Sequence, residues 1–595
     1  MTGRLRSPRR GLARRAVAAL AALAVIAAPS LVARPASGFA IYYVSGHVVD
    51  SVTDASLAGV CIILRPPDAC RDVDFKTDVN GNWGPAPLVS DSQWDVYYVL
   101  TGYAIGHDVV PASRQTDIFL QTRLVTLPGV PPTPNTTCGT PGPATASVYL
   151  PNITKTLGGP NGWDTPFIVQ NVGTVNTVLE ASYYKFADGS LVTCRKASAV
   201  RPGTSFADIP NNDAYLPDDT QFSVVVRSFG APVVAVVNEV QGSGAGFESL
   251  AYDGASSGAT KVYLPNVTRR FYGYDVPFIV QNLGSLSTIA TASFISFDGT
   301  KTFSKTLVIQ PGRSGVVDPD FTPGLVDGTQ YAVTVTADQP ISVVVNAHNE
   351  TNGPPVAYSH NGLVLGATTL YAPYVAKHAG PDDRVAPVVV QNVSAAAVDA
   401  TLTFTPLTTG GLPQVFTFSG IAPGASRAFD PRFALGTTTV CTTASATCLG
   451  NGEYALKLTA TGSVAAVVLV VSATTAGAYA AAPMVTLRQY LPNVTRTLGG
   501  SSGYTTPIYL QAAGATSTAT LRWYRFSDAS LVVTQNVTLP ANSSVAIDPR
   551  TVAGLADDTQ YAVIVDGVGG PVNAIVYEQS FTGGDGVMIY EGFAQ

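Results

Sequence analysis

The sequence predicts an all-β chain of tandem β-sandwich domains, and three observations support this prediction. Short runs rich in Val, Ile, Thr and Tyr recur along the 595 residues and are bounded by turn residues, including 56 Gly and 42 Pro. Four sequence blocks return in the same order, at steps of 114, 108 and 119 residues. The repeated part carries no long apolar pattern of helical period. Together these features predict strands and turns rather than helices.

The first forty residues predict a secretory signal peptide. Six Arg lie within residues 1–15, an apolar run follows from Ala16 to Val32, and small residues occupy Ala33 to Gly38. A retained membrane anchor is the alternative, because the apolar run is near the lower length limit for spanning. No later run has 18 uncharged apolar residues, so no transmembrane segment is expected after signal removal. We therefore expect a secreted, extracellular and cell-surface associated protein, with a composition that looks bacterial.

The charge distribution argues against nucleic-acid binding. Seven Arg and no acid lie before residue 38, which leaves 27 basic and 40 acidic residues in the rest of the chain. Contacts to phosphate need clustered Lys and Arg, and the sequence has no such cluster beyond the leader. We expect no nucleic-acid partner.

The region from 41 to 127 resembles a known family in four short motifs. These are Ser45–Asp50, Leu57–Val60, Thr77–Trp83 and Gly102-Tyr103. The region is similar to the carboxypeptidase regulatory-like domain, which implies a transthyretin-like β-sandwich acting as a folding or spacer module, without peptidase activity. Residues 128–147, rich in Pro, Thr and Gly, predict a linker.

The rest of the chain predicts four repeats, at 148–260, 261–370, 371–488 and 489–595. The first block is Tyr-Leu-Pro-Asn and the second is Pro-Phe-Ile-Val-Gln-Asn, each degenerate in one copy. The third block is an acid, and the fourth is Thr-Gln-Phe/Tyr. In repeat 1 the four blocks are Tyr149–Asn152, Pro166–Asn171, Asp208 and Thr220–Phe222. The near-constant spacing predicts one domain of about 110 residues per copy.

Within each copy the pattern predicts about seven short antiparallel strands. Tyr331 to Thr336 alternates apolar and polar residues, and a second run follows Pro340 across an expected turn at Ala337 to Gln339. Seven strands in about 110 residues are typical of an immunoglobulin-like sandwich, a resemblance of architecture only. Four such sandwiches in series predict an elongated array.

The even number of cysteines in an exported chain predicts disulfides. Fifteen connectivities are open, and sequence neighbours favour Cys61–Cys70, Cys138–Cys194 and Cys441–Cys448. A zinc site is disfavoured, because no C-x-x-C motif occurs and no His lies near these residues in sequence.

The search for chemistry predicts no catalytic residue, no metal site and no cofactor. The five His share no register, and both G-x-S-x-G matches, at 254–258 and 499–503, fall in Gly/Ser-rich segments rather than between a strand and a helix. Glu239 and Glu578 occupy related positions in repeats 1 and 4, where repeat 2 has Ala347. The recurring Asn-x-Thr motif at Asn152, Asn266 and Asn493 predicts a strand-edge or turn feature, with glycosylation as the alternative.

One loop position could carry recognition. Three places before the second block, repeats 1, 2 and 4 have Trp163, Tyr274 and Tyr504, and repeat 3 has Arg384. Aromatic rings on such loops can stack on sugars or anchor proteins, or they can cover the end of their own core.

These observations predict an exported, non-enzymatic structural or adhesive protein. Its expected partner is a protein or glycan of the cell surface or matrix. A carbohydrate-binding protein that uses the aromatic loops is the alternative, and a secreted hydrolase with an unfamiliar site is a third hypothesis.

Overall fold

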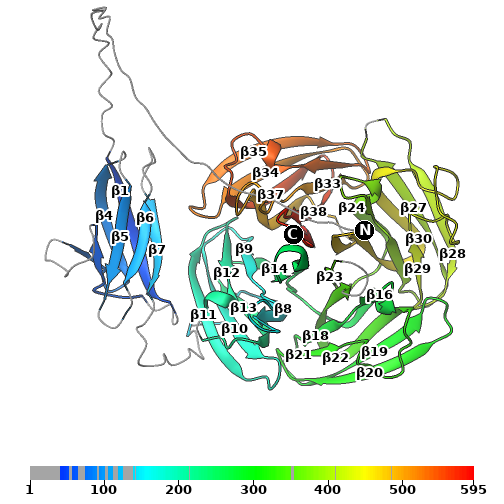
Figure 1. Cartoon of the computed structure of the whole chain (residues 1–595), viewed down its shortest axis with the longest axis horizontal. Helices are drawn as coiled ribbons and strands as arrows, with labels where there is room; N and C mark the ends of the chain where they lie inside the picture. Colours follow the sequence, from blue (N-terminus) through cyan, green and yellow to red (C-terminus); the bar gives the residue numbers. More distant parts are fainter. Residues whose placement is uncertain are drawn as a thin grey trace, which may run out of the picture.

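The computed structural model describes residues 41–51, 56–64, 74–89, 93–100, 103, 105–110, 118–124, 139–140, 142–213, 215–349, 354–408, 410–483 and 485–594. The predicted signal peptide and most of the predicted linker lie outside these residues. The described chain is all-β, as predicted, with strands and three single-turn 3₁₀ helices (Figure 1). None of its helices is long and apolar enough to span a membrane.

The first seven strands form a small two-layered sandwich. One sheet has the order β4-β1-β7, with β1 parallel to β7, and the other has the order β3-β2-β5-β6. The core between the sheets contains Val44, Trp83 and Tyr98, all of which are buried. The strands are β1 (Ile41–Asp50), β2 (Cys61–Ile63), β3 (Phe75–Lys76), β4 (Asn82–Val89), β5 (Trp94–Val99), β6 (Gly106–Val110) and β7 (Ile118–Leu124).

The remaining strands fall into four groups, which we call repeats 1 to 4. Repeat 1 contains β8 (Ala146–Lys155), β9 (Phe167–Asn171), β10 (Thr177–Lys185), β11 (Leu191–Val200), β12 (Ser205–Asp208), η1 (Pro210–Asn212), β13 (Thr220–Phe229), β14 (Val233–Gln241), η2 (Gly244–Gly246) and β15 (Glu248–Asp253). Repeat 2 contains β16 (Ala259–Phe271), β17 (Tyr274–Asp275), β18 (Phe278–Asn282), β19 (Thr288–Ser296), β20 (Thr302–Ile309), β21 (Ser314–Val317), β22 (Thr329–Asn349) and β23 (Val356–Asn361).

Repeats 3 and 4 follow the same order. Repeat 3 contains β24 (Ala367–Ala379), β25 (Arg384–Val385), β26 (Val388–Asn392), β27 (Val398–Pro406), β28 (Gln414–Ile421), β29 (Ser426–Phe429), β30 (Gly452–Val471) and β31 (Ala476–Ala480). Repeat 4 contains β32 (Arg488–Arg496), β33 (Ile508–Ala512), β34 (Ser517–Arg525), β35 (Leu531–Leu539), β36 (Ser544–Ile547), η3 (Pro549–Thr551), β37 (Thr559–Val568), β38 (Val572–Gln579), β39 (Val587–Glu591) and β40 (Phe593–Ala594).

Each repeat is an antiparallel sandwich whose sheets come from that repeat alone. In repeat 1 the two sheets have the orders β11-β10-β13-β8 and β12-β9-β14-β15. In repeats 2 and 3 a long strand, β22 or β30, belongs to both layers and joins them into one eight-stranded sheet. The turn predicted at Ala337 to Gln339 therefore does not interrupt the strand. Instead, β22 pairs with β16 and β19 through its first half and with β18 through its second half.

The Tyr-Leu-Pro-Asn block forms a β-bulge in the first strand of every repeat. In repeat 1, Leu150 lies opposite Val224 and Ile153 lies opposite Phe222, so Pro151 and Asn152 face one residue of the partner strand. The same shift occurs at Leu264/Val267, Ala372/Val375 and Leu491/Val494. Proline suits a bulge because its missing N–H would otherwise break the ladder. This block is therefore a structural feature of the strand.

The four repeats close into a ring (Figure 1). One strand from near the end of each repeat lies at a common axis: β15 contacts β23 and β39, and β31 contacts the same two strands. The elongated array predicted from the sequence is therefore wrong. The local patterns correctly indicate four sandwiches, but the angle between successive sandwiches brings the fourth against the first.

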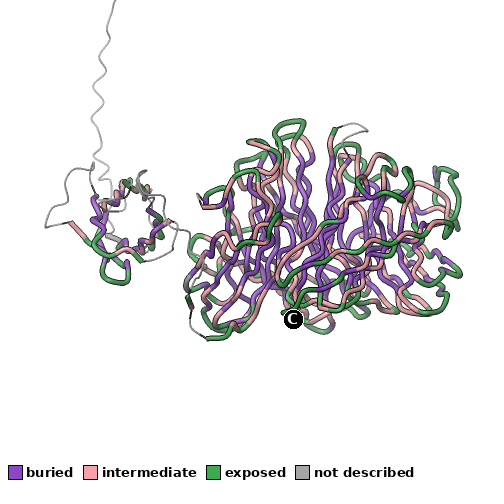
Figure 2. Tube along the Cα trace, turned by 90° about the horizontal axis from the view of Figure 1, so that it is seen from below, coloured by how far each residue is buried: buried purple, intermediate pink, exposed green. Residues whose placement is uncertain are grey.

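The hydrophobic cores are continuous around this ring. The core of repeat 4 includes Ile168, Val236 and Ala251 of repeat 1, and the core of repeat 1 includes Ile279 and Val344 of repeat 2. Residues of repeat 3 extend the core of repeat 2 in the same way, and residues of repeat 4 extend that of repeat 3. Figure 2 shows buried chain running through the full width of the ring. Each sandwich thus buries apolar surface against both neighbours.

Candidate functional site: the interfaces between repeats

In repeats 2, 3 and 4 the glutamine of the second sequence block donates to the preceding repeat, whereas Gln170 of repeat 1 donates to the Gly203 carbonyl of its own repeat. The Gln281 side chain donates from Nε2 to the Val224 carbonyl of repeat 1 at 3.5 Å, and Gln391 donates to Val333 of repeat 2 at 3.2 Å. Gln511 donates in the same way to Leu456 of repeat 3, at 3.0 Å. These glutamines are fully buried, so the bonds provide acceptors for side-chain N–H groups that water cannot reach.

The asparagine that follows this glutamine acts within its own repeat. Asn171 donates from Nδ2 to the carbonyls of Val175 and Val200, both at 2.8 Å. Asn282 and Asn392 make the corresponding pairs of bonds. Each asparagine joins a loop to the end of a strand in its own sandwich, which gives the second block its structural role.

The first and fourth blocks meet through a second pair of amides. Gln221 donates from Nε2 to Asn152 Oδ1 at 2.6 Å, and the Tyr252 hydroxyl donates to the Asn152 carbonyl at 2.6 Å. Asn266 with Gln330, and Asn493 with Gln560, repeat the amide pair. In repeat 3 both members change together: the Tyr374 hydroxyl donates to the Glu453 carboxylate at 3.0 Å. The pairing is thus kept when its chemistry changes.

Two buried glutamates connect this amide network to the neighbouring repeat. Asn152 of repeat 1 and Asn346 of repeat 2 both donate from Nδ2 to the Glu239 carboxylate, at 2.9–3.0 Å and 3.2 Å. Asn493 of repeat 4 and Asn238 of repeat 1 donate to Glu578 Oε2, at 3.0 Å and 3.1 Å. Glu239 therefore bridges repeats 1 and 2, and Glu578 bridges repeats 4 and 1.

Burial makes these carboxylates hard to ionise. Loss of hydration raises the pKa of both Glu239 and Glu578 to about 7, although the asparagine amides partly oppose the rise. The ionisable groups that face them are tyrosines: Tyr252 beside Glu239, and Tyr504 and Tyr590 beside Glu578. The bridges thus rest on amide donors rather than on ion pairs.

The other two interfaces are apolar at the matching positions. Ala347 replaces the glutamate in repeat 2, and Leu469, in the place of Asn238, packs against the same core. Between repeats 3 and 4, Val470 and Tyr577 fill these positions in one core. The glutamate and the asparagine across the interface are therefore present together or absent together. Repeat 1 alone has the polar pairing on both sides.

The candidate ligand-contacting residues lie at or near these interfaces. The Trp163 ring packs edge-on against the His348 ring of repeat 2, with centroids 5.1 Å apart. The guanidinium group of Arg384 lies 5.3 Å from the ring centroid of Tyr577 in repeat 4. Tyr504 packs at the edge of the repeat 4 core, which includes residues of repeat 1.

Tyr274 completes this set of four positions. Its ring lies 5.5 Å from that of Tyr358 in its own repeat, and burial raises the pKa of its hydroxyl. All three aromatic rings are half-buried. Their contact with a ligand stays a prediction.

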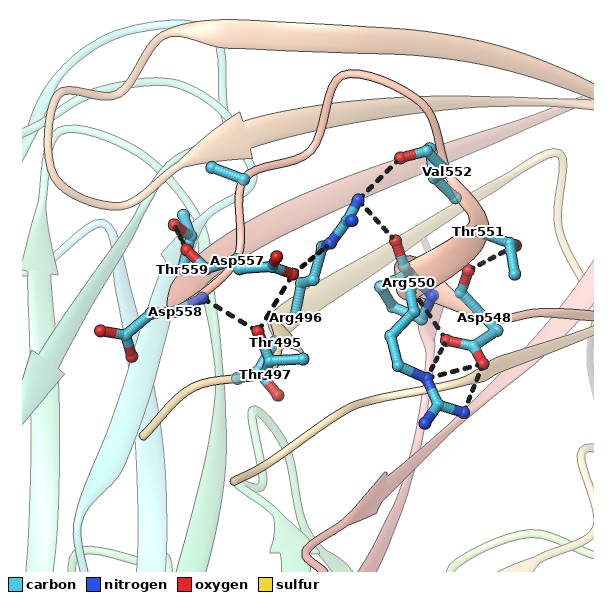
Figure 3. A network of polar contacts seen from close by, with 12 residues as sticks. Thr495, Arg496, Thr497, Asp548, Arg550, Thr551, Val552, Asp557, Asp558 and Thr559 are labelled. Atoms are coloured by element: carbon cyan, nitrogen blue, oxygen red, sulfur yellow. Dashed lines mark hydrogen bonds and ion pairs between the residues drawn. The ribbon is translucent and has the colours of Figure 1, made fainter. Parts of the chain in front are cut away.

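A basic residue shared by all repeats holds the long loop after the third block. In repeat 4, Arg496 donates from Nη1 to the Val552 carbonyl at 3.0 Å and pairs through Nε with Asp557 at 2.8 Å (Figure 3). The third-block acid, Asp548, binds Arg550 through both carboxylate oxygens and accepts the Arg550 backbone N–H at 2.9 Å. Lys155, Arg269 and Lys377 donate to loop carbonyls in the same way. A basic side chain three places after the bulge in every repeat is the sequence signal for this residue.

Asp585 joins all four repeats near the axis of the ring. Its carboxylate accepts the backbone N–H of Ala357 in repeat 2 at 2.8 Å and of Ala476 in repeat 3 at 3.1 Å. Its own N–H donates to the Phe247 carbonyl of repeat 1 at 2.7 Å. The side chain has no exposed surface, and burial raises its pKa well above the usual range. Sequence analysis missed Asp585, because no other repeat has an acid at this position.

The described cysteines are all oxidised. Cys441 and Cys448 form a disulfide within the long loop of repeat 3, with Cα atoms 5.5 Å apart. Cys61 and Cys194 are also disulfide-bonded. Their predicted partners, Cys70 and Cys138, lie outside the described residues, so these two pairings stay predictions.

The recurring Asn-x-Thr asparagines are buried rather than presented to solvent. Asn152, Asn266 and Asn493 are 4%, 2% and 2% exposed, because their side chains complete the amide network. Burial would keep a modifying enzyme from these three side chains in the folded ring.

The remaining titratable groups form no cluster suited to a metal. Among the described residues, no group of three or more His, Cys, Asp or Glu is placed to hold an ion. Burial lowers the pKa of His348 and His360 to about 4, so both are neutral at physiological pH. A cavity beside Arg195 and Asp208 has a volume of about 10 Å³, which is room for about one water molecule.

Comparison with known proteins identifies no family for this chain. No family model matches, so the resemblance of the first sandwich to the carboxypeptidase regulatory-like domain rests on its sequence motifs. No curated protein matches either.

Several solved structures match this chain weakly. A Thermotoga maritima protein matches at 16% identity and a TM-score of 0.16, over 18% of this chain and 94% of its own. The major pilin subunit of Bacillus cereus matches at 8% identity and a TM-score of 0.12, over 70% and 95%. A tetra-tandem repeat from the extending region of a large adhesion protein matches at 10% identity and 0.10, over 71% and 92%. These TM-scores are too low to bear on function.

Proposed function

We propose that this chain is an exported, non-enzymatic structural or adhesive protein of the cell surface, in which a rigid ring presents a binding face. The observation that supports this proposal best is that the four repeats close into a rigid ring. The repeated polar residues of the four blocks are engaged in holding loops and neighbouring repeats together. A structural role in keeping the ring rigid therefore explains why these polar residues recur in the repeats. The leader sequence, with its Arg-rich start and apolar run, supports export.

The loops at one end of the ring are the best candidate for the binding face. In repeats 1 and 4 the loop after the first strand meets the loop after the third block, where Gly158 donates to Asp219 and Gly499 donates to Asp558. In repeat 2, Arg270 at the end of β16 pairs with Asp320 of the corresponding loop. Asn349 donates to the Tyr272 carbonyl, which brings a third loop to the same end.

Three exposed aromatic side chains lie on these loops. Phe321 is 82% exposed, Tyr272 is 66% exposed and Phe581 is 53% exposed. Exposed rings on loops of a rigid scaffold are frequent anchors of protein and glycan partners. At the opposite end the exposed apolar side chains are aliphatic, including Leu286 and Val568. We therefore assign binding to the aromatic end.

Export and binding can be tested separately. Biotinylation of intact cells with a reagent that cannot cross membranes should label the full chain, and recovery from the cytoplasm alone would contradict export. Purified chain should bind cells saturably, and Phe321→Ala with Tyr272→Ala should weaken this binding about tenfold or more. Leu286→Ala with Val568→Ala is the matched control at the other end. Equal weakening by both double variants would contradict the assignment of the binding face.

A further inference from the structure

The interface between repeats 4 and 1 differs from the other three because no described segment of backbone crosses it. Connectors 254–258, 362–366 and 481–487 cross the other interfaces. Residues far apart in sequence hold repeats 4 and 1 together. Tyr490 donates to the Val172 carbonyl at 3.0 Å, and Ser205 donates to the Pro492 carbonyl at 2.9 Å. This interface is the place where the ring can open without strain on a connector.

Two contacts at this interface recur at interfaces that a connector does cross, whereas the glutamine bond does not, because Gln170 donates to Gly203 of its own repeat. Ser205 donates to the Pro492 carbonyl as Ser426 donates to the Pro265 carbonyl between repeats 2 and 3. The Glu578 bridge to Asn238 repeats the Glu239 bridge to Asn346 between repeats 1 and 2. These two contacts therefore form without a connector between the repeats.

The surface of repeat 4 selects its partner through Glu578. A buried carboxylate needs a donor across the interface, and leaving it without one is strongly unfavourable. Repeat 1 offers Asn238, whereas repeats 3 and 4 have Leu469 and Tyr577 at that position. Repeat 2 has Asn346, but that side chain is already bound to Glu239. The surface thus fits repeat 1.

The connector that follows repeat 1 has the composition of a hinge. Its five residues are Gly-Ala-Ser-Ser-Gly, at 254–258, and Ser256 and Ser257 are exposed. The other connectors are Gly-Leu-Val-Leu-Gly at 362–366 and Ala-Ala-Pro-Met-Val-Thr-Leu at 481–487. Gly/Ser-rich segments are flexible. Val364, Leu365 and Leu487 of the other connectors are exposed as well, so the connectors differ in composition rather than in burial. Repeat 1 therefore combines the flexible connector with polar bridges on both of its sides.

We propose that repeat 1 is exchanged between two copies of this chain, so that the repeat 1 of each copy completes the ring of the other. The faces of repeats 4 and 2 that hold Asn238 and Glu239 are the interaction surface, and the partner is a second copy of the chain. Every contact in the exchanged dimer is one that the closed monomer already makes. Domain exchange of this kind needs a hinge and the release of repeat 1 from both of its neighbours, repeats 4 and 2.

A pair of complementary variants of the full chain tests the proposal. In Asn238→Leu, the buried Glu578 of the same chain loses its donor from repeat 1. In Glu578→Leu, the buried Asn238 loses its acceptor. When the two variants are mixed, an exchanged heterodimer pairs leucine with leucine at one interface and Asn238 with Glu578 at the other. The homodimers and the monomers keep the mismatched pairs.

The two variants carry different affinity tags and are mixed in mild denaturant before return to buffer. The ratio of heterodimers to homodimers, measured by tandem purification, should be about tenfold above the ratio found with two tagged wild-type chains, which corresponds to about 1.4 kcal/mol. Heterodimers at the wild-type fraction, or monomers alone, would overturn the proposal. If either variant does not fold, the test is the recovery of mixed dimers from two wild-type chains that carry different tags. The absence of mixed dimers at any protein concentration would refute the proposal.

Discussion

Replacing Glu578 by Gln should make the ring less sensitive to pH between about 5 and 8. The pKa of Glu578 is about 7 in the ring and near 4.5 in an unfolded chain, because burial disfavours the charged form. A carboxyl group with a raised pKa stabilises the folded state fully only below its unfolded pKa, and this stability falls as pH rises through the folded pKa. At 1.36 kcal/mol per pKa unit, the loss reaches about 3 kcal/mol above pH 7.

The geometry makes Gln a clean replacement. Both asparagine donors bond to the same oxygen, Glu578 Oε2, so a Gln carbonyl placed there keeps both bonds. The repeats contain roughly 450 residues from Ala146 to Ala594. At about 2.1 cal/mol/K per residue, 3 kcal/mol corresponds to about 3 °C in Tm. Between pH 5 and pH 8, the Tm of wild type should therefore fall about 3 °C more than that of Glu578→Gln.

Thermal unfolding of the full chain, followed by circular dichroism at both pH values, measures this difference. Glu239→Gln is the matched comparison, because Asn152 and Asn346 bond to both oxygens of Glu239 and one pair of bonds is lost. That variant should lose the same pH sensitivity and also be less stable at pH 5. Equal falls in Tm for wild type and Glu578→Gln would refute the assignment of a buried, hard-to-ionise carboxyl group.

Three further substitutions test the packing of the ring. Asp585→Ala should lower the free energy of unfolding by about 3 kcal/mol, because it leaves buried backbone amides of repeats 2 and 3 without an acceptor; unchanged hydrogen exchange at those amides would contradict this. In Gly477→Ala the new Cβ would lie 2.6 Å from Ile589 Cδ1, which should cost about 1–3 kcal/mol. Adding Ile589→Ala should then cost less than the sum of the single changes in denaturant unfolding, and strict additivity would argue against the contact. Trp163→Ala should destabilise the ring by about 2 kcal/mol through loss of its contact with His348. Loss of glycan-array binding in this variant would favour the carbohydrate-binding alternative. Intact binding would exclude the Trp163 loop as a glycan contact.

The strands and the repeat could be predicted because they follow from local patterns. Alternating residues such as Tyr331 to Thr336 lie in strands, and each block recurs at one place in the sandwich. The bulge at Pro151 and Asn152 could have been inferred from proline inside a strand pattern. Ring closure could not be inferred in this way, because it depends on the angle between whole sandwiches and on contacts such as Asn238 with Glu578, 340 residues apart.

The interface residues were visible in the sequence, but their role was not. Glu239 and Glu578 were recognised as related positions, and Ala347 as the exception. The partner position, where repeats 1 and 2 have Asn238 and Asn346 and repeat 3 has Leu469, is not evident from one repeat alone. Comparing the two positions in adjacent repeats, rather than within one repeat, shows that acid and amide occur together. Such a comparison requires knowing that neighbouring repeats touch.

A closed ring also restricts how such a gene can change in length. In an open string of sandwiches, duplication of one unit adds a domain at little cost, since each new unit finds one neighbour and leaves one free end. Here the surfaces of repeats 1 and 4 already cover each other, so a fifth copy would find no uncovered surface to occupy. A fifth repeat would either displace one of the four repeats from the ring or lie outside the ring, with both of its apolar interface surfaces exposed to water. Gain or loss of a single unit should therefore be selected against, and variation should collect in the loops instead.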